Sequence, residues 1–318
     1  DLTNVVISDV HPDNGEAYAL WITAEGQTVN IKDCALLAHE SKSGDRGIKI
    51  DNEYLGDKEA KVTLNIDGLK VKSQKKAAIV VKSKAGADIN IKNIDVSEVA
   101  ADTNNAVWVD SNAKQYAGLV SVTGASMVVE GVDPIEGDTA DALQVAFNTA
   151  AATENAIVQL PAGEYAMPSE IANGVTIIGA EGAHINAPEG KTVSVTADNV
   201  TISNVDFVGN FNGQEKVAVL SLSGKNPTIA NCTFTGAAGN GYGITVNGQG
   251  ADDVITIKNC DFSQDDFFKP IFDNWNGLNG ATLVIDGCTL ANGLYTMHID
   301  GNNESGKVIV KNSTLDGF

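Results

Sequence analysis

Ile257-Lys258-Asn259-Cys260 is the clearest of four copies of a short phrase that decides the fold of this chain. Each copy begins with isoleucine, has asparagine or glycine third and has cysteine or valine fourth. Counted from Val205, the fourth positions lie 27, 28 and 28 residues apart, and 25 more lead to Ser313 of a weaker copy. This period holds two or three short strands and is too short for a βαβ unit. The other full copies are Ile202-Ser203-Asn204-Val205, Ile229-Ala230-Asn231-Cys232 and Ile285-Asp286-Gly287-Cys288.

Related phrases occur in the first 131 residues, so the same coil is expected there. They are Ile31-Lys32-Asp33-Cys34, Ile66-Asp67-Gly68-Leu69 and Ile91-Lys92-Asn93-Ile94. We predict an all-β chain that forms a right-handed parallel β-helix, a solenoid of two consecutive arrays. In such a coil, equivalent residues of neighbouring turns lie one strand spacing apart, roughly 4.8 Å.

Two kinds of side chain should then form files along the stack. Asparagines at the corners are expected to hydrogen-bond to one another, namely Asn93, Asn204, Asn231, Asn259 and Asn312. The four cysteines share one repeat position and should be buried as small hydrophobic side chains, namely Cys34, Cys232, Cys260 and Cys288. A disulfide between adjacent turns is left open by the spacing, and a zinc site is disfavoured because the sequence has no CxxC pair.

A helix should separate the two arrays. We place the N-terminal array at 1–131, a turn-rich linker at 132–137 and the second array at 138–318, opening with a short capping α-helix at about 138–151. Asp138 offers an N-cap, and one apolar face follows helical spacing. That face comprises Leu143, Ala146, Phe147 and Ala150.

This joint carries a resemblance to a known family. The order of Asp138 to Gln144, Leu160 to Tyr165 and Val175 to Ala180 resembles the opening of the pectin-lyase-like right-handed parallel β-helix superfamily, which includes pectate lyases and phage tailspikes. The resemblance covers 138–318 well and 1–131 through the repeats alone. It implies that the helix plugs the first turn, and it specifies fold far better than function.

Charge and hydropathy restrict the partners. The net charge is -20, divided as -5 over 1–131 and -15 over 132–318. Nucleic-acid binding is disfavoured because it needs basic side chains to neutralise phosphates. No apolar run approaches the roughly 20 residues that span a bilayer, so we expect no membrane insertion. A basic run from Lys70 to Lys84 is interpreted as a solvated sheet surface.

The sequence lacks some of the catalytic residues that the resemblance implies. A pectate-lyase-like reaction would need Ca²⁺ on clustered carboxylates and an arginine base, and Arg46 is the single arginine. A polygalacturonase-like reaction would need a Gly-His-Gly turn, which is absent. Asp252-Asp253 and Asp265-Asp266 are read as turn residues. We therefore assign no catalytic residue, no metal ligand and no cofactor, and leave Ca²⁺ binding by acidic turns open.

Outward aromatic residues beside polar acceptors suggest contact with sugars, whose rings have apolar faces and hydroxyl edges. Val107-Trp108-Val109-Asp110 predicts a strand with Trp108 outward, and Trp21 and His298 hold the same position in other turns. The candidate glycan-binding residues are Trp21, Trp108, Asp110, His298 and Asp300.

Together these features favour a non-enzymatic structural or adhesive module, extracellular on a bacterial cell surface or a virion surface. The alternative is a secreted polysaccharide lyase or glycoside hydrolase acting on an acidic polysaccharide. Neighbouring domains or subunits are expected to cover the open solenoid ends, and a homotrimer is left open.

Overall fold

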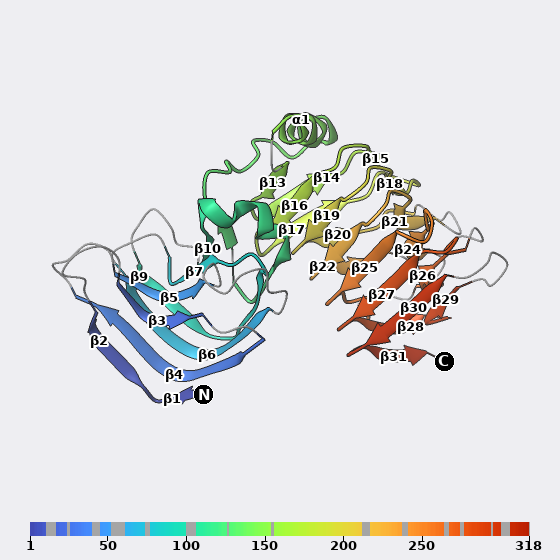
Figure 1. The fold of residues 1–318 in the computed structure, drawn as a ribbon. Helices are drawn as coiled ribbons and strands as arrows, with labels where there is room; N and C mark the ends of the chain where they lie inside the picture. Colours follow the sequence, from blue (N-terminus) through green and yellow to red (C-terminus); the bar gives the residue numbers. More distant parts are fainter. Residues whose placement is uncertain are drawn as a thin grey trace. The chain divides into compact units, whose positions relative to one another are not determined.

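The protein is an all-β parallel β-solenoid of about nine turns, which confirms the predicted fold class (Figure 1). The computed structural model describes residues 1–10, 17–23, 26–39, 45–51, 61–73, 77–99, 106–125, 127–153, 156–211, 217–236, 241–263, 267–273, 277–293, 295–299 and 306–317. The chain divides into two compact units, Asp1–Val132 (unit 1) and Asp133–Phe318 (unit 2).

Unit 1 winds two parallel sheets. The first contains the two longest strands, β4 and β6, drawn in Figure 1 as curved arrows. Its members are β1 (Leu2–Thr3), β2 (Val6–Val10), β4 (Thr28–Ala38), β6 (Val62–Ser73), β8 (Ala87–Ile91), β9 (Ile94–Val99) and β11 (Val120–Thr123). The second sheet contains β3 (Ala17–Ile22), β5 (Asp45–Asp51), β7 (Ile79–Lys82), β10 (Val107–Val109) and β12 (Met127–Val129).

The third position of the repeated phrase marks a backbone corner. In β4 and β6 this position is Asp33 and Gly68, whose φ angles of 51° and 86° lie in the left-handed region. Asparagine, aspartate and glycine tolerate that region best, which explains the residues in the phrase. A side chain at Gly68 would also meet the Asp33 Oδ1 atom at 2.7 Å. Both the backbone angle and the limited space therefore restrict which residues can occupy this corner.

Unit 1 also contains a 3₁₀ helix that the repeat did not predict. This helix, η2 (Ser111–Leu119), contacts β7, β10, β11 and β12. Ala113 and Ala117 are its buried side chains in this packing. The residues that follow the strand around Trp108 thus belong to a packed helix.

Unit 2 has three strands in most turns. One sheet contains β13 (Ile157–Leu160), β16 (Thr176–Gly179), β19 (Thr201–Ser203), β22 (Thr228–Ala230), β25 (Val254–Lys258), β27 (Thr282–Asp286) and β30 (Lys307–Lys311). A second contains β14 (Gly163–Ala166), β17 (Ala183–Asn186), β20 (Asp206–Val208) and β23 (Thr233–Thr235), and single bridges through Asp261 lead on to the pair β28 (Thr289–Gly293) and β31 (Thr314–Gly317). The third contains β15 (Glu170–Ile171), β18 (Val193–Val195), β21 (Ala218–Leu222), β24 (Tyr242–Val246), β26 (Lys269–Phe272) and β29 (Met297–His298).

The expected asparagine file forms only in part in unit 2. Asn259 Nδ2 donates to Asn231 Oδ1 at 3.1 Å, as predicted. Asn312 instead donates to Asp286 at 2.9 Å, because glycine replaces asparagine in the preceding turn. The Asn204 amide has no hydrogen bond to any described residue, so the expectation was wrong there. These four asparagines nevertheless share positive φ angles, so backbone conformation explains their recurrence better than side-chain pairing. Asn93, in unit 1, donates to Asp67 at 2.9 Å and not to an asparagine, so the expectation was wrong there as well.

The core of unit 2 combines aliphatic side chains with a file of stacked rings. Phe207, Phe234 and Phe262 follow one another in successive turns, with ring centroids 5.1 and 4.5 Å apart. All three are at most 1% exposed. Their recurrence in Asp206-Phe207-Val208, Thr233-Phe234-Thr235 and Asp261-Phe262-Ser263 is visible in the sequence, although the repeated phrase did not predict this file.

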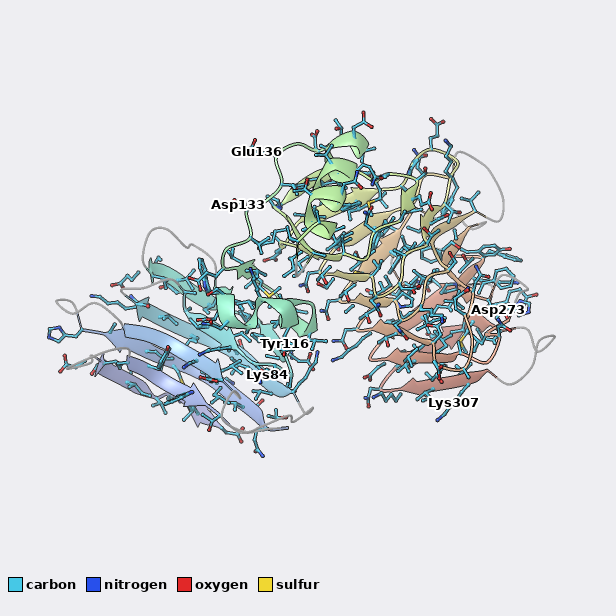
Figure 2. The ribbon with its side chains drawn as sticks, turned by 45° about the horizontal axis from the view of Figure 1, so that its top comes forward. Lys84, Tyr116, Asp133, Glu136, Asp273 and Lys307 are labelled. Atoms are coloured by element: carbon cyan, nitrogen blue, oxygen red, sulfur yellow. The ribbon has the colours of Figure 1, made fainter. Side chains whose placement is uncertain are left out.

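Helix α1 (Ala140–Ala151) confirms the predicted helix, with a corrected start. The N-cap is Thr139 and not Asp138, because the Thr139 hydroxyl accepts from Ala142 N at 3.2 Å. Leu143, Phe147 and Ala150 are buried, and the helix contacts β13 and β14. Figure 2 shows Asp133 and Glu136 on the segment that leads into this helix. Within that segment, Pro134 forms a parallel bridge with Gln159 of β13.

No helix in the described ranges combines the length and the apolar character required to cross a bilayer.

Candidate functional site

Trp21 and Trp108 lie in one file of the second sheet of unit 1. The strand register places Trp21, Lys49, Val80 and Trp108 in successive turns. The two indoles are therefore three turns apart, roughly 14 Å at the usual strand spacing. As predicted, Val107 and Val109 are fully buried while Trp108 faces outward and is partly covered.

Trp21 belongs to a small exposed cluster around a lysine. The Lys49 ammonium lies 4.8 Å from the Trp21 ring and 5.0 Å from the Tyr18 ring. It also pairs with Asp51 at 2.7 Å, and the Asp51 carboxylate is almost fully buried. Trp21 itself remains 50% exposed. One ring face is therefore occupied by the lysine, while much of the side chain is open to solvent.

Asp110 has a structural role that the sequence did not reveal. It is the N-cap of η2, and its Oδ1 atom accepts from Asn112 N at 2.9 Å and from Asn112 Nδ2 at 2.8 Å. The run Asp110-Ser111-Asn112 could have indicated the start of a helix, because aspartate is a preferred N-cap residue. These bonds use acceptor capacity that a sugar hydroxyl would otherwise require.

His298 lies in unit 2, in a file of the third sheet that also contains Thr245 and Phe272. The structure thus assigns Trp21, Trp108 and Asp110 to one unit and His298 to the other. Asp300 lies outside the described residues.

The densest group of aromatic side chains surrounds Lys269, beside His298. The Lys269 ammonium lies 4.0 Å from the centroid of the Phe272 ring and 5.4 to 5.8 Å from three more. Lys269 is 3% exposed and contacts the Nδ1 atom of His298. Asp273, labelled in Figure 2, directly follows Phe272 and is fully buried. We call this group the lysine–aromatic cluster; it consists of Tyr242, Phe268, Lys269, Phe272, Tyr295 and His298.

The lysine–aromatic cluster has a buried base and an exposed rim. Burial raises the pKa of Tyr242. Tyr295, in contrast, is 50% exposed and packs edge-on against Phe268 with centroids 5.7 Å apart. Cation–π attraction at a desolvated ammonium reaches about 2 kcal/mol, so Lys269 holds these rings in place. The result is an exposed Tyr295 ring that packs against Phe268, with the His298 imidazole beside it.

The sequence pointed to His298 but missed the rest of this cluster. Tyr242, Phe268 and Tyr295 lie outside the repeated phrase, and only the topology brings them together. The unusual local density of aromatic residues in Phe267-Phe268 and Phe272 was the one available signal.

The predicted cysteine file forms in unit 2, whereas Cys34 of unit 1 is buried in a file with aliphatic side chains. In unit 1, Cys34 aligns with Leu69 of the next turn, and Leu69 aligns with Ile94. In unit 2, Cys260 N donates to Cys288 Sγ at 3.4 Å, and Cys288 N donates to Ser313 Oγ at 3.1 Å. All four cysteines are buried free thiols. They are components of the core.

A second polar file lies on the outer face of β14, β17 and β20. It places Glu164, His184 and Asp206 in successive turns. His184 Nδ1 lies 3.4 Å from Asp206 Oδ2, and Asp206 also accepts from the Thr233 hydroxyl at 2.5 Å. Glu164 accepts from Asn186 at 2.8 Å. Two carboxylates therefore flank one imidazole on an accessible sheet.

Asp253 of the first acid pair and Lys70 of the basic run both have structural partners. Asp253 is fully buried and accepts from Asn226 N at 2.7 Å and from Gln249 N at 2.9 Å, as expected of a turn residue. Lys70 pairs with Glu98 at 2.6 Å, and this hydrogen bond lowers the pKa of Glu98 and raises that of Lys70. Asp265 and Asp266 lie outside the described residues.

Among the residues that the structure describes, no group of three or more His, Cys, Asp or Glu side chains is arranged to hold a metal ion. Comparison with known proteins finds no match to a family model, to a curated protein or to a solved structure.

Proposed function

We propose that this protein is a non-enzymatic structural or adhesive β-solenoid module of a cell surface or virion surface, and that it binds glycans through the lysine–aromatic cluster. The observation that carries the proposal is the exposed ring of Tyr295, held against Phe268 and accompanied by His298. An exposed ring that packs on a partly buried aromatic side chain offers a flat apolar surface to a sugar.

We place the glycan site in unit 2 because several aromatic rings gather around Lys269 there. Trp21 in unit 1 has an exposed ring that lies 6.3 Å from the Tyr18 ring and a lysine ammonium nearby. In the lysine–aromatic cluster, four rings and an imidazole converge on one ammonium. Rigid aromatic contact area loses little conformational entropy on binding, which favours this surface over isolated rings.

Binding of the full chain to an array of immobilised glycans tests this proposal. Tyr295→Ala should reduce binding at least tenfold, because truncating an exposed anchor ring removes its contact area. Leu119→Ala, at a side chain 43% exposed in the other unit, is the control and should bind as the wild type does. Equal binding by wild type and Tyr295→Ala, or no binding by either, would contradict the proposal.

The rival function is a secreted lyase or hydrolase acting on an acidic polysaccharide, and the file of Glu164, His184 and Asp206 favours it. Paired carboxylates on a sheet are the groups that glycoside hydrolysis uses. The protein would be incubated with polygalacturonate, and new reducing or unsaturated ends would be measured. Turnover that is lost in both Glu164→Gln and Asp206→Asn would replace the adhesive function with the enzymatic one.

The same proposal has three further parts. They are likeness to the pectin-lyase-like superfamily, surface localisation, and partners that cover the solenoid ends. The likeness rests on the segment 138–144 that opens the helix and on the two segments that follow the helix, 160–165 and 175–180. A homotrimer is the assembly that tailspike-like proteins would suggest, and the mass of the protein in solution tests it. No cofactor is included in the proposal.

A further inference from the structure

An uninterrupted file of hydrogen-bonded amides runs along the outer face of unit 1. Asn90 Nδ2 donates to Asn65 Oδ1 at 2.8 Å, and Asn65 Nδ2 donates to Asn30 Oδ1 at 2.8 Å. Asp1 accepts at one end, from Asn30 at 2.7 Å, and Thr123 donates at the other, to Asn90 at 3.1 Å. We call these five residues the amide ladder.

The amide ladder retains hydrogen-bonding capacity after its internal bonds are made. A primary amide has two N–H donors and two acceptor lone pairs, and each of Asn30, Asn65 and Asn90 uses one donor along the ladder. The second donor and remaining lone pairs are available to a ligand. Asn30, Asn90 and Thr123 are exposed, and Asn65 is partly exposed. From Asn30 to Thr123 the ladder extends roughly 14 Å at the usual strand spacing.

A charged ridge runs parallel to the amide ladder, two residues further along each strand. Lys32 and Asp67 are register partners, and Lys92 Nζ lies 3.4 Å from Asp67 Oδ2. The hydrogen bond from Asn93 is the main cause that lowers the pKa of Asp67, so this carboxylate stays ionised at neutral pH. The ridge therefore alternates in sign, and Lys32 and Lys92 against Asp67 leave it a formal charge of +1.

A hollow of about 400 Å³ lies between the amide ladder and the charged ridge. Ile31, Ile66 and Ile91 contribute to its lining, and each is at most 6% exposed because its side chain belongs to the core. The floor of the hollow is thus strand backbone, with hydrogen-bonding side chains along one border and ion-paired side chains along the other. Its long direction follows the stack of turns.

The chemistry of the hollow distinguishes among extended ligands. Polyanions are disfavoured by the net charge of -20 and by the pairing of Lys92 with Asp67. Hydroxyl groups both donate and accept hydrogen bonds, and so they match the two unused functions of each amide. A strand spacing of roughly 4.8 Å is close to the length of one pyranose residue in an extended chain, so successive sugars can meet successive amides.

We infer that the hollow along the amide ladder is a binding site for an uncharged, extended polysaccharide whose chain lies along the solenoid axis. This site is separate from the lysine–aromatic cluster and does not depend on it. Affinity should increase with chain length until the ladder is filled, because each added sugar gains hydrogen bonds without further loss of overall translational freedom.

Isothermal titration of the full chain with β-1,4-linked gluco-, xylo- and manno-hexasaccharides tests the inference, with the matching disaccharides and hexagalacturonate as comparators. At least one neutral hexasaccharide should bind at least tenfold more tightly than its disaccharide and than hexagalacturonate. Asn65→Ala should weaken that binding at least tenfold, because it removes the central amide and interrupts the ladder. Asn90→Ser, which keeps a short polar side chain, provides a second variant, and circular dichroism verifies that both are folded.

Two controls separate this inference from the proposed function. Asn186→Ala removes an exposed amide of unit 2 that bonds to Glu164, and Tyr295→Ala removes the aromatic rim. Asn186→Ala should retain hexasaccharide binding, and Asn65→Ala should weaken that binding by the same factor in the wild-type and Tyr295→Ala backgrounds. Loss of binding in Tyr295→Ala but not in Asn65→Ala or Asn90→Ser would overturn the inference while supporting the aromatic site. Failure of all neutral hexasaccharides to bind, or preference for hexagalacturonate, would also overturn it.

Discussion

At the scale of single residues, the backbone corner explains which residues occupy the third position of the repeated phrase. In most copies the phrase has Asn, Asp or Gly third because the backbone turns through the left-handed region there, as at Asn231, Asn259 and Gly287; Asn93 is an exception. The sequence therefore predicts where each turn bends. It does not predict which corner amides bond to each other, because that depends on which residue the next turn presents.

Asn259 lies at a corner with a φ angle of 50°, which asparagine tolerates better than alanine does. Asn259→Ala therefore tests whether the backbone angle selects the residue at this position. We expect it to lower the free energy of unfolding by about 1 kcal/mol more than Asn259→Gly, since glycine enters this region without steric cost. Urea denaturation of both variants measures the difference. Equal losses would mean that the amide contact with Asn231, and not the backbone, governs this position.

The stacked rings of unit 2 give a larger residue-scale effect. Phe234→Ala should lower the free energy of unfolding by about 3 to 5 kcal/mol, because it leaves a cavity between Phe207 and Phe262. Val254→Ala, at a side chain 43% exposed, should change it by about 0.5 kcal/mol or less. Similar losses in the two variants, measured by urea denaturation, would contradict the position of Phe234 in the core.

At the scale of elements, the cysteine file links three turns of unit 2 through one repeat position. The sequence predicts this file because Cys232, Cys260 and Cys288 hold the same place in the phrase. It could not predict η2, since Ser111–Leu119 has no strong apolar periodicity. The lysine–aromatic cluster was missed for a related reason, because its members come from segments between the phrases and meet only after the coil has formed.

Burial raises the pKa of the Cys260 thiol well above its usual value. The unfolded thiol ionises above about pH 8.5 while the folded one stays neutral, so this contribution to stability is complete below that pH and declines above it. Between pH 9 and 10.5, wild type should lose about 1.4 kcal/mol more per pH unit than Cys260→Val. Urea denaturation in the presence of a reductant measures this, and parallel losses would contradict the burial of the thiol.

At the scale of the whole molecule, the repeated phrase predicted the coil but not its cross-section. Unit 1 builds its turns from two sheets that include long bent strands, whereas unit 2 uses three sheets of mostly short strands. The phrase marks one corner in each turn, so the number of remaining corners depends on segments that do not repeat. The same limit applies to function, because both proposed binding surfaces depend on which side chains successive turns bring into register.

Equivalent residues of successive turns are direct neighbours, as in the pairing of Thr228 with Thr256. A double variant, Thr228→Cys with Thr256→Cys, tests this stacking, because one strand spacing of roughly 4.8 Å lies within the Cα separation that a disulfide permits. Peptide mapping by mass spectrometry after mild oxidation should identify a disulfide between these positions, but not in the control Thr228→Cys with Lys258→Cys, which is offset by two residues. Equal or preferred cross-linking of the offset pair would contradict the stacked register on which both proposed surfaces depend.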